Sequence, residues 1–276
     1  MAAIHDEIER LPRLGFGLWQ VPEETASLLV EQAISTGYRL VDTAEAYYNE
    51  VGVGEGLRRS EIARDELVIQ SKVWNTHHGF SRTLQAFDDS MDRLGLEKLD
   101  LYLMHWPSQA QDKFVETWKA MLRLRDDGRV KKVGVCNFAI PQLVRLMEET
   151  GEAPFLNQVE LHPYFQQKPL RAYHAKAKIL TQSWSPLGIW KGRASPLANE
   201  IVQNIAHKHA KNPGQVILRW HLDEGLHLLT KSEKMERIQQ NFEVLEFNLD
   251  AEDLKSLRGL DREDGRNGPD PETAIF

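Results

Sequence analysis

The feature that most constrains this 276-residue chain is a regular alternation of short β-rich runs with longer amphipathic segments. The short runs predict strands at residues 38–43, 67–73, 99–105, 130–136, 155–161, 179–185, 226–231 and 242–247. The segments between them place apolar residues at helical spacing. In residues 23–36 the predicted buried face consists of Leu28, Leu29, Ala33 and Ile34. Such alternation implies a parallel sheet, because parallel neighbours need long crossover connections.

Eight predicted strands favour a closed (β/α)8 barrel, the TIM fold, over an open sheet, and such a barrel takes about 250 residues. No linker rich in Pro, Gly or Ser divides the chain, so residues 1–276 are expected to form one domain. Residues 14–20 precede the first predicted strand and are expected to form a small hairpin that caps one end of the barrel. Residues 261–276 are polar and rich in Gly and Pro, which predicts a C-terminal loop.

Further helices are predicted at residues 81–94, 114–124 and 141–149, and several helix ends carry sequence signals. Gly37 and Gly95 follow predicted helices as C-terminal caps do. The pair Asn212 and Pro213 is typical of a helix start, with Asn as the cap and Pro at the first helical position.

The composition excludes several classes of protein. A net charge of −7 and a pI near 5.8 argue against a general nucleic-acid binder and against an anionic membrane surface as partner. A single cysteine, Cys136, excludes an intrachain disulfide. The first ten residues are acidic and lack the basic-then-apolar order of a secretory signal. Because no apolar run approaches the roughly 18 residues that a membrane span needs, a cytoplasmic protein is expected.

Ionisable side chains of four different types lie at one end of three consecutive predicted strands. Asp42 ends the first strand and is followed by Tyr47. Lys72 lies near the end of the second strand, and His105 ends the third. Since active-site residues of parallel barrels project from the C-terminal ends of strands, these four side chains are expected to meet in one site.

This combination suits the reduction of a carbonyl group. Hydride attack turns the carbonyl oxygen into an alkoxide, which needs a proton donor. The hydroxyl of Tyr47 can donate, but its ordinary pKa of about 10 is high, and a nearby Lys72 is expected to lower that pKa. Asp42 would keep Lys72 protonated, and a neutral His105 would orient the substrate oxygen.

Each of these residues also has a structural alternative. Asp42 could begin a turn, Tyr47 could pack beside Tyr48, and His105 could be a core histidine with satisfied hydrogen bonds. Lys72 could be solvated, although its apolar neighbours would bury it, and a buried lysine without a partner is costly. The shared position at strand ends favours a common site over four coincidences.

The motifs around these residues resemble those of a known family. The segment GYRLVDTAEAYYNE, residues 37–50, is similar to the aldo-keto reductase signature around its catalytic tyrosine. Matching motifs follow in order: SKVW (71–74), LYLMHWP (101–107), VGVCNF (133–138), NQVELHP (157–163), SWSPLG (183–188) and KSEKMERIQQN (231–241). The resemblance implies a barrel that binds NADPH in extended form without a Rossmann domain, and a carbonyl reductase that uses the four residues above.

The resemblance also implies cofactor contacts. Asn137 and Gln158 match positions that hold the nicotinamide carboxamide, next to Cys136 where the family usually has Ser, and Trp184 matches the ring that stacks on the nicotinamide. The remaining cofactor positions are Ser185, Leu187 and Gly188 along the pyrophosphate, Lys231, Ser232, Lys234 and Arg237 around the 2′-phosphate, and Asn241 at the adenine. A start of a helix near Arg237 would add backbone N–H groups, which attract phosphate. The carboxylate of Glu233 would repel the phosphate if it pointed inward.

The SWSPLG motif is similar to that of the bacterial 2,5-diketo-D-gluconate reductase branch. This implies a monomer acting on a small-molecule carbonyl substrate: a keto-sugar acid such as 2,5-diketo-D-gluconate, an α-keto carbonyl compound or an aldehyde. The predicted walls of the substrate pocket are Trp19, Tyr48, Trp74 and Trp106, together with the C-terminal loop.

Two other functions compete with this hypothesis. A metal-dependent barrel hydrolase needs clustered His and carboxylate ligands, but His77 and His78 are neighbours in a loop, and His207 and His209 do not share a helix face. No metal site is therefore predicted. A non-catalytic nicotinamide-nucleotide-binding module of the same fold is the second alternative, and a degraded set of catalytic residues would favour it.

Overall fold

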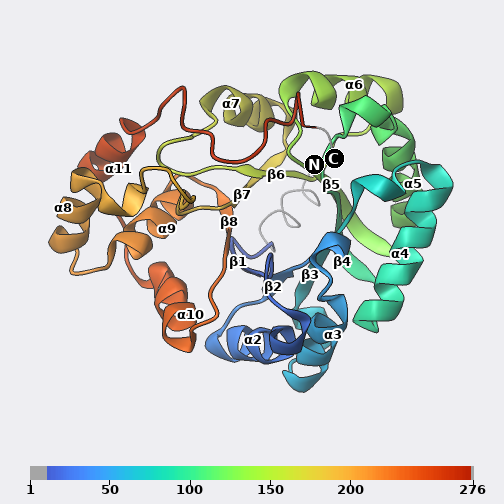
Figure 1. The fold of residues 1–276 in the computed structure, drawn as a ribbon, viewed down its shortest axis with the longest axis horizontal. Coiled ribbons are helices and arrows are strands. Elements are labelled where there is room, and N and C mark those ends of the chain that lie inside the picture. Colours follow the sequence, from blue (N-terminus) through green and yellow to red (C-terminus); the bar gives the residue numbers. More distant parts are fainter. Residues whose placement is uncertain (1–10, 275–276) are drawn as a thin grey trace.

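The structure, a computed structural model, describes residues 11–274 and contains a closed barrel of eight parallel strands (Figure 1). The strands are β1 (Leu14–Gly17), β2 (Leu40–Asp42), β3 (Val68–Val73), β4 (Leu99–Met104), β5 (Val130–Cys136), β6 (Leu156–Glu160), β7 (Leu180–Trp184) and β8 (His227–Thr230). Their order around the barrel follows the chain, and β1 pairs with β8 to close it. The predicted (β/α)8 fold is confirmed.

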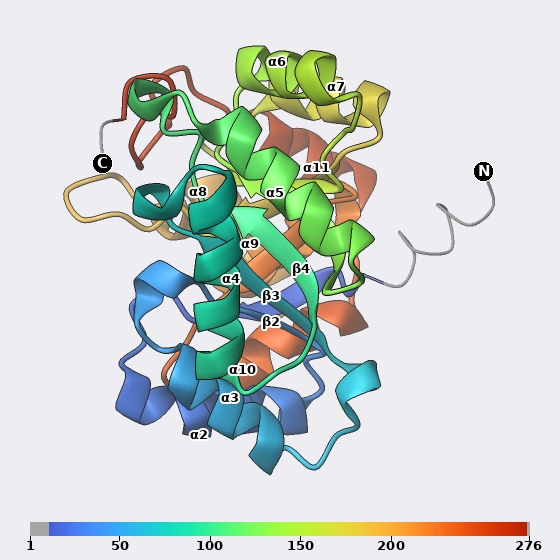
Figure 2. The same ribbon diagram turned by 90° about the vertical axis from the view of Figure 1, so that its right-hand side faces the viewer.

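Helices surround the barrel on all sides, as Figures 1 and 2 show. They are α2 (Glu23–Thr36), α3 (Glu50–Arg59), α4 (Phe80–Leu94), α5 (Phe114–Asp126), α6 (Ile140–Thr150), α7 (Lys168–Ala177), α8 (Glu200–Lys208), α9 (Pro213–Asp223), α10 (Met235–Phe242) and α11 (Ala251–Arg258). The predicted caps are confirmed. Gly37 and Gly95 end α2 and α4 with positive φ, and Asn212 accepts a 2.9 Å hydrogen bond from the backbone N–H of Gln215 at the start of α9.

The predicted N-terminal hairpin is wrong, because residues 14–17 form the first barrel strand. Two glycines in four residues weaken the strand signal of this segment, yet the barrel requires one of them. A Cβ on Gly15 would lie 2.7 Å from side-chain atoms of both Leu229 and Leu40. A side chain at this position would therefore displace Leu40 or Leu229 from its place in the core.

The strand predicted at residues 242–247 is also wrong, because this segment ends α10 and continues as a 3-10 turn, Glu243–Glu246. The ring of Phe242 packs on that of Tyr38, with centroids 5.1 Å apart, and covers Gly37 at the end of α2. A short apolar run does not distinguish a strand from a helix end by its periodicity. The predicted total of eight strands was right because this false strand replaced the missed β1.

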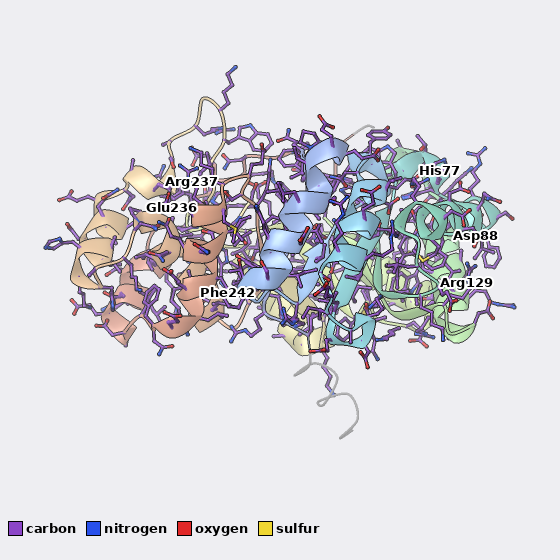
Figure 3. The ribbon with its side chains drawn as sticks, turned by 90° about the horizontal axis from the view of Figure 1, so that it is seen from below. His77, Asp88, Arg129, Glu236, Arg237 and Phe242 are labelled. Carbon is purple, nitrogen blue, oxygen red and sulfur yellow. The ribbon has the colours of Figure 1, made fainter. Side chains whose placement is uncertain are left out.

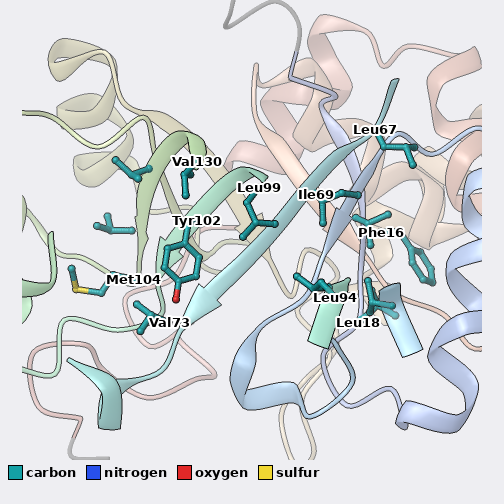
Figure 4. Packing of buried hydrophobic residues seen from close by; sticks show 14 of the residues in the cluster. Phe16, Leu18, Leu67, Ile69, Val73, Leu94, Leu99, Tyr102, Met104 and Val130 are labelled. Atoms are coloured by element: carbon teal, nitrogen blue, oxygen red, sulfur yellow. The ribbon is translucent and has the colours of Figure 1, made fainter. Parts of the chain in front are cut away.

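The main hydrophobic core lies between the strands and the surrounding helices (Figure 4). Phe16, Ile69 and Tyr102 project outward from their strands into this layer, where Leu94 of α4 also packs. The predicted buried face of α2 is correct for Leu29, Ala33 and Ile34 and wrong for Leu28, which is 53% exposed. Val30 takes its place in the core.

The barrel interior changes from apolar to polar along the strands. A cluster of apolar side chains fills part of this interior: Leu11, Leu40, Leu101, Leu103, Cys136, Leu156 and Leu229. Two residues further along several strands, on the same inward face, the side chains are polar. These are Asp42 after Leu40, Gln70 after Val68, Gln158 after Leu156 and Gln182 after Leu180. This change creates a buried polar layer near the C-terminal ends of the strands.

The predicted C-terminal loop is confirmed for residues 261–274, which contain neither helix nor strand. Figure 1 shows this loop in red, running from α11 past α7 toward β5. Residues 1–10, whose sequence argued against a secretory signal, and residues 275–276 lie outside the described part of the chain. None of the helices within residues 11–274 is both long and apolar enough to cross a membrane.

Candidate active site

A buried ion pair between β2 and β3 forms the centre of the site. The ammonium Nζ of Lys72 lies 2.7 and 2.8 Å from the two carboxylate oxygens of Asp42, and the same Nζ donates to the carbonyl of Thr43 at 2.9 Å. Burial of Lys72 lowers its pKa, but the charges of Asp42 and Tyr47 more than offset this, so its pKa is raised above the ordinary value. Lys72 is therefore a cation at neutral pH.

Tyr47 ends a 3-10 turn, Glu45–Tyr47, that follows β2. Its hydroxyl oxygen accepts a 3.2 Å hydrogen bond from Nζ of Lys72, which also lies 4.7 Å from the centre of the phenol ring. The predicted contact of Tyr47, Lys72 and Asp42 is thus present in the structure.

The predicted direction of the Tyr47 pKa shift is wrong. Burial raises the pKa of the Tyr47 phenol above its ordinary value, and the opposing effect of Lys72 is smaller. The physical reason is that removing water penalises the phenolate, and Asp42 adds a second negative charge nearby. Tyr47 is therefore fully protonated at neutral pH, the state in which it can donate a proton.

His105 follows β4 and lies beside Tyr47, with ring centroids 5.6 Å apart. The same ring also lies beside the indole of Trp74, with ring centroids 5.0 Å apart. Burial and the nearby charge of Lys72 hold the pKa of His105 well below its usual value, so the imidazole is neutral, as predicted. The structure therefore brings all four predicted catalytic side chains into one cluster.

Three polar residues of the Tyr47 loop hold it in place, and sequence reasoning missed them. The amide of Asn49 donates to the carbonyls of Leu18 and Val21, both at 2.9 Å, and the buried carboxylate of Glu50 accepts from the hydroxyl of Ser71 at 2.5 Å. Glu45 accepts from the backbone N–H of Trp74 at 3.0 Å and pairs with His77. The segment 43–50 is consequently fixed from both sides of Tyr47.

The carboxylate of Asp42 also receives hydrogen bonds from the glutamines of the polar layer. Gln70 donates to Oδ1 of Asp42, and Gln158 donates to the same atom at 3.2 Å. Both glutamines also donate to Oε1 of Gln182, at 3.0 and 2.8 Å. Gln158 was predicted as a cofactor contact, whereas Gln70 and Gln182 were not predicted, although their alternation with apolar residues was a usable signal.

Asn137 and Trp184 lie at the ends of β5 and β7 and contact each other. The indole N–H of Trp184 donates to Oδ1 of Asn137 at 2.8 Å, and Nδ2 of Asn137 donates to the carbonyl of His105 at 3.1 Å. Asn137 adopts the left-handed conformation with φ of 61°. Cys136 is fully buried in the apolar cluster of the barrel, and burial raises the pKa of its thiol.

A tight turn follows Trp184. Ser185 has a φ of 49°, and its carbonyl accepts a 2.9 Å hydrogen bond from the N–H of Gly188. Gly188 has a φ of 61°, and a Cβ there would lie 2.8 Å from the ring of His162. Leu187 packs between the two main core clusters. The turn thus keeps its backbone close to the end of the barrel.

The predicted phosphate-binding residues lie after β8, around the start of α10. Lys231 pairs with Glu233 at 3.3 Å, and the hydroxyl of Ser232 accepts from the N–H of Lys234 at 3.0 Å. Arg237 is exposed and forms no ion pair with any residue of the described range. Figure 3 places Arg237 and His77 on the same side of the molecule, with Phe242 at the opposite end of α10.

Glu233 is exposed and is neutralised by Lys231, so the predicted repulsion of a phosphate is weakened. Lys234 is exposed, and Asn241 is partly buried further along α10. The positive side chains at this end of the helix, together with the positive end of the helix dipole, fit an anionic group.

The predicted aromatic pocket residues differ in exposure. Trp106 is buried, Trp74 is partly buried against His105, and Trp19 and Tyr48 are 46% and 82% exposed. Tyr48 directly follows Tyr47 in the left-handed conformation. Within the described residues, no group of three or more His, Cys, Asp or Glu side chains is arranged to hold a metal ion.

The chain is similar to known proteins over most of its length. The model of the aldo/keto reductase family matches residues 13–262. The methylglyoxal reductase DkgA of Escherichia coli is 45% identical over 262 residues, which is 95% of this chain and 94% of that protein. An aldo-keto reductase of Mycolicibacterium smegmatis is 44% identical over 96% of this chain and 95% of its own length.

Solved structures are similar as well. The crystal structure of Gox0644 in its apo form has a TM-score of 0.91 and 46% identity, and the match covers 96% of this chain and 95% of that one. A mutant of Gox0644 solved in complex with NADPH gives the same TM-score, identity and coverage.

Proposed function

The chain belongs to the aldo/keto reductase family and is an NADP-dependent oxidoreductase, and we propose that it reduces small carbonyl compounds to alcohols with Tyr47 as the proton donor. One observation supports the assignment of the donor above all others. The hydroxyl of Tyr47 is the only phenol within hydrogen-bond distance of Lys72 among the described residues, and Lys72 is itself held by Asp42.

In the proposed reaction, the substrate carbonyl oxygen lies between the hydroxyl of Tyr47 and the ring of His105. NADPH supplies the hydride when it is bound. Tyr47 carries its proton at neutral pH, so it can donate that proton to the oxygen as negative charge develops there. The ammonium of Lys72, 3.2 Å away, then stabilises the phenolate that remains. Asp42 keeps Lys72 charged throughout, and the neutral ring of His105 orients the substrate.

We further propose that the cofactor lies across the ends of β5 to β8. Asn137 and Gln158 would hold the carboxamide, and Trp184 would stack on the nicotinamide, with Cys136 packing beneath them. The pyrophosphate would follow the turn of Ser185, Leu187 and Gly188, the 2′-phosphate would bind Lys231, Ser232, Lys234 and Arg237, and the adenine would contact Asn241. The unpaired guanidinium of Arg237 supports a preference for NADPH over NADH.

The substrate is proposed to be a small dicarbonyl or keto acid. Relatives named methylglyoxal reductase support an α-dicarbonyl compound, and the 2-keto acid 2,5-diketo-D-gluconate is the second candidate. Trp74 and Trp106 would line the pocket near His105, while the exposed Trp19 and Tyr48 would form its rim. Aromatic walls of this kind favour small, weakly charged substrates.

The alternative, a non-catalytic nicotinamide-nucleotide-binding module, is less well supported, because the ion pair, the phenol and the neutral imidazole are all in contact. We also propose that residues 1–276 act as a single, monomeric domain in the cytoplasm. Sedimentation of the purified chain tests the oligomeric state.

A spectrophotometric screen tests the proposed function. The purified protein is mixed with NADPH and, in parallel, with methylglyoxal, 2,5-diketo-D-gluconate, simple keto acids and aldehydes, and oxidation of the nicotinamide is followed. We expect turnover with at least one α-dicarbonyl compound, and activity that persists after treatment with a chelator. NADPH binding without oxidation across all of these carbonyl classes would instead support the binding module.

A further inference from the structure

A buried carboxylate at the end of β6 connects the C-terminal loop to the barrel. Glu160 is 2% exposed, and its two oxygens accept hydrogen bonds from consecutive backbone N–H groups of the loop. Asn267 donates to Oε1 at 2.7 Å, and Gly268 donates to Oε2 at 2.8 Å. The ring of His162 also contacts Oε1, at 3.0 Å. Without these partners a buried carboxylate would be strongly destabilising, so the loop and Glu160 stabilise each other.

This docking brings Gly268 into direct contact with Trp184. A Cβ on Gly268 would lie 2.7 Å from an atom of the six-membered ring of Trp184 and 3.0 Å from Oε2 of Glu160. The backbone of Gly268 itself does not require glycine, because its φ is not positive. Close packing on the indole is therefore the reason that this position has no side chain.

The indole of Trp184 is held on two sides. Its benzo edge meets Gly268, while its N–H donates to Asn137, whose amide donates to the carbonyl of His105. The loop also reaches the turn after β7, because the side chain of Asn267 donates to the carbonyl of Gly188 at 3.3 Å. A continuous set of contacts thus runs from the C-terminal loop to the catalytic cluster.

We propose that Glu160 is a positioning residue: it docks the C-terminal loop so that Gly268 fixes the plane of the Trp184 indole, on which the nicotinamide stacks. This inference rests on the proposed function, since it concerns the same cofactor site. Glu160 does not touch the substrate or cofactor in this account. Its effect reaches them through Gly268 and Trp184.

Replacing Glu160 with Gln tests the docking contact. Glutamine keeps one acceptor oxygen but directs an NH2 group at the second backbone N–H of the loop. Glu263→Gln is the matched control, because Glu263 is exposed on the same loop and undergoes the same chemical change. We expect E160Q to raise the Kd for NADPH about tenfold or more, because losing a hydrogen bond to the carboxylate lowers the fraction of molecules with the loop docked, while E263Q binds as the wild type does.

The outcomes separate this inference from the proposed function. A wild-type protein that fails to bind NADPH would overturn the proposed function. A wild type and an E160Q variant with equal affinity for NADPH would overturn only the role of Glu160. Thermal unfolding of both variants shows whether E160Q remains folded at the assay temperature.

A double-mutant cycle keeps the inference testable if E160Q does not fold. Gly268→Ala should weaken NADPH binding in the wild-type background, because the added methyl group displaces the indole. In a Trp184→Phe background the six-membered ring atom that the methyl group meets is gone, so Gly268→Ala should then cost clearly less NADPH affinity, with only its 3.0 Å approach to Oε2 of Glu160 remaining. Equal losses in the two backgrounds would show that Gly268 does not act through Trp184 and would refute the proposal.

Discussion

Replacing Asp42 with Asn should destabilise the protein severely. The carboxylate holds a lysine with 0% exposure at 2.7 and 2.8 Å, and it also accepts from Gln70 and Gln158 through Oδ1. An asparagine that keeps its oxygen toward these donors must turn its NH2 group toward the ammonium of Lys72. Breaking one partner of a buried ion pair typically costs about 3–5 kcal/mol, so we expect the free energy of unfolding to fall by about that amount.

The partner substitution Lys72→Met completes the test. Alone, this substitution leaves the carboxylate of Asp42 buried with only amide donors around it, and it should also lower the free energy of unfolding. In the double variant neither charge remains. Its loss of unfolding free energy should therefore be about 2–3 kcal/mol smaller than the sum of the losses in the two single variants.

Urea unfolding of the wild type and the three variants at neutral pH measures this coupling. Strictly additive losses would refute the claim that Asp42 and Lys72 form one electrostatic unit. Activity provides a second measurement, since NADPH oxidation should be lost in all three variants even where stability recovers.

Further predictions concern acid stability, cofactor choice and barrel closure. Burial lowers the pKa of His78 to about 4, so the folded protein keeps this ring neutral while the unfolded chain takes up a proton below about pH 6.5. The free energy of unfolding therefore falls as the pH drops from about 6.5 toward 4. His78→Leu should reduce this pH dependence by about 1.4 kcal/mol per pH unit, which urea unfolding across this pH range measures. Arg237→Gln should raise the Kd for NADPH about tenfold or more without changing the Kd for NADH. Fluorescence titrations measure both values, and an equal loss of affinity for the two cofactors would contradict the phosphate assignment. Gly15→Ala should lower the free energy of unfolding in urea by about 1–3 kcal/mol, because its Cβ would lie 2.7 Å from core atoms. Gly17→Ala is the control: its nearest contact is at 3.6 Å, so it should cost less than about 1 kcal/mol. Similar losses of stability in the two variants would contradict the packing of β1.

The sequence predicted the barrel because the strand and helix periodicities are local properties. It also predicted the catalytic cluster, since Asp42, Lys72 and His105 lie at the same end of consecutive parallel strands, where the fold must bring them together. The missed strand β1 is different. Its four residues have little strand propensity, and only the packing of Leu40 and Leu229 around Gly15 explains why it belongs in the barrel.

The remaining errors concern interactions that depend on three-dimensional surroundings. The pKa of Tyr47 combines a charge effect, which the sequence suggested, with a larger effect of burial, which only the structure reveals. The contact between Glu160 and the loop joins residues more than a hundred positions apart, and so does the one between Gln70 and Gln182. No local pattern in the chain indicates which of its many polar residues will meet across such distances.

The central claim is that Tyr47 donates the proton to the substrate oxygen, and single-turnover kinetics of a Tyr47→Phe variant test it most directly. The variant is loaded with NADPH, mixed with methylglyoxal, and the oxidation of the nicotinamide is followed. We expect the rate to fall about 10²–10⁴-fold, the usual contribution of a positioned proton donor, with the affinity for NADPH unchanged. Oxidation of NADPH at the wild-type rate in this variant would contradict the account.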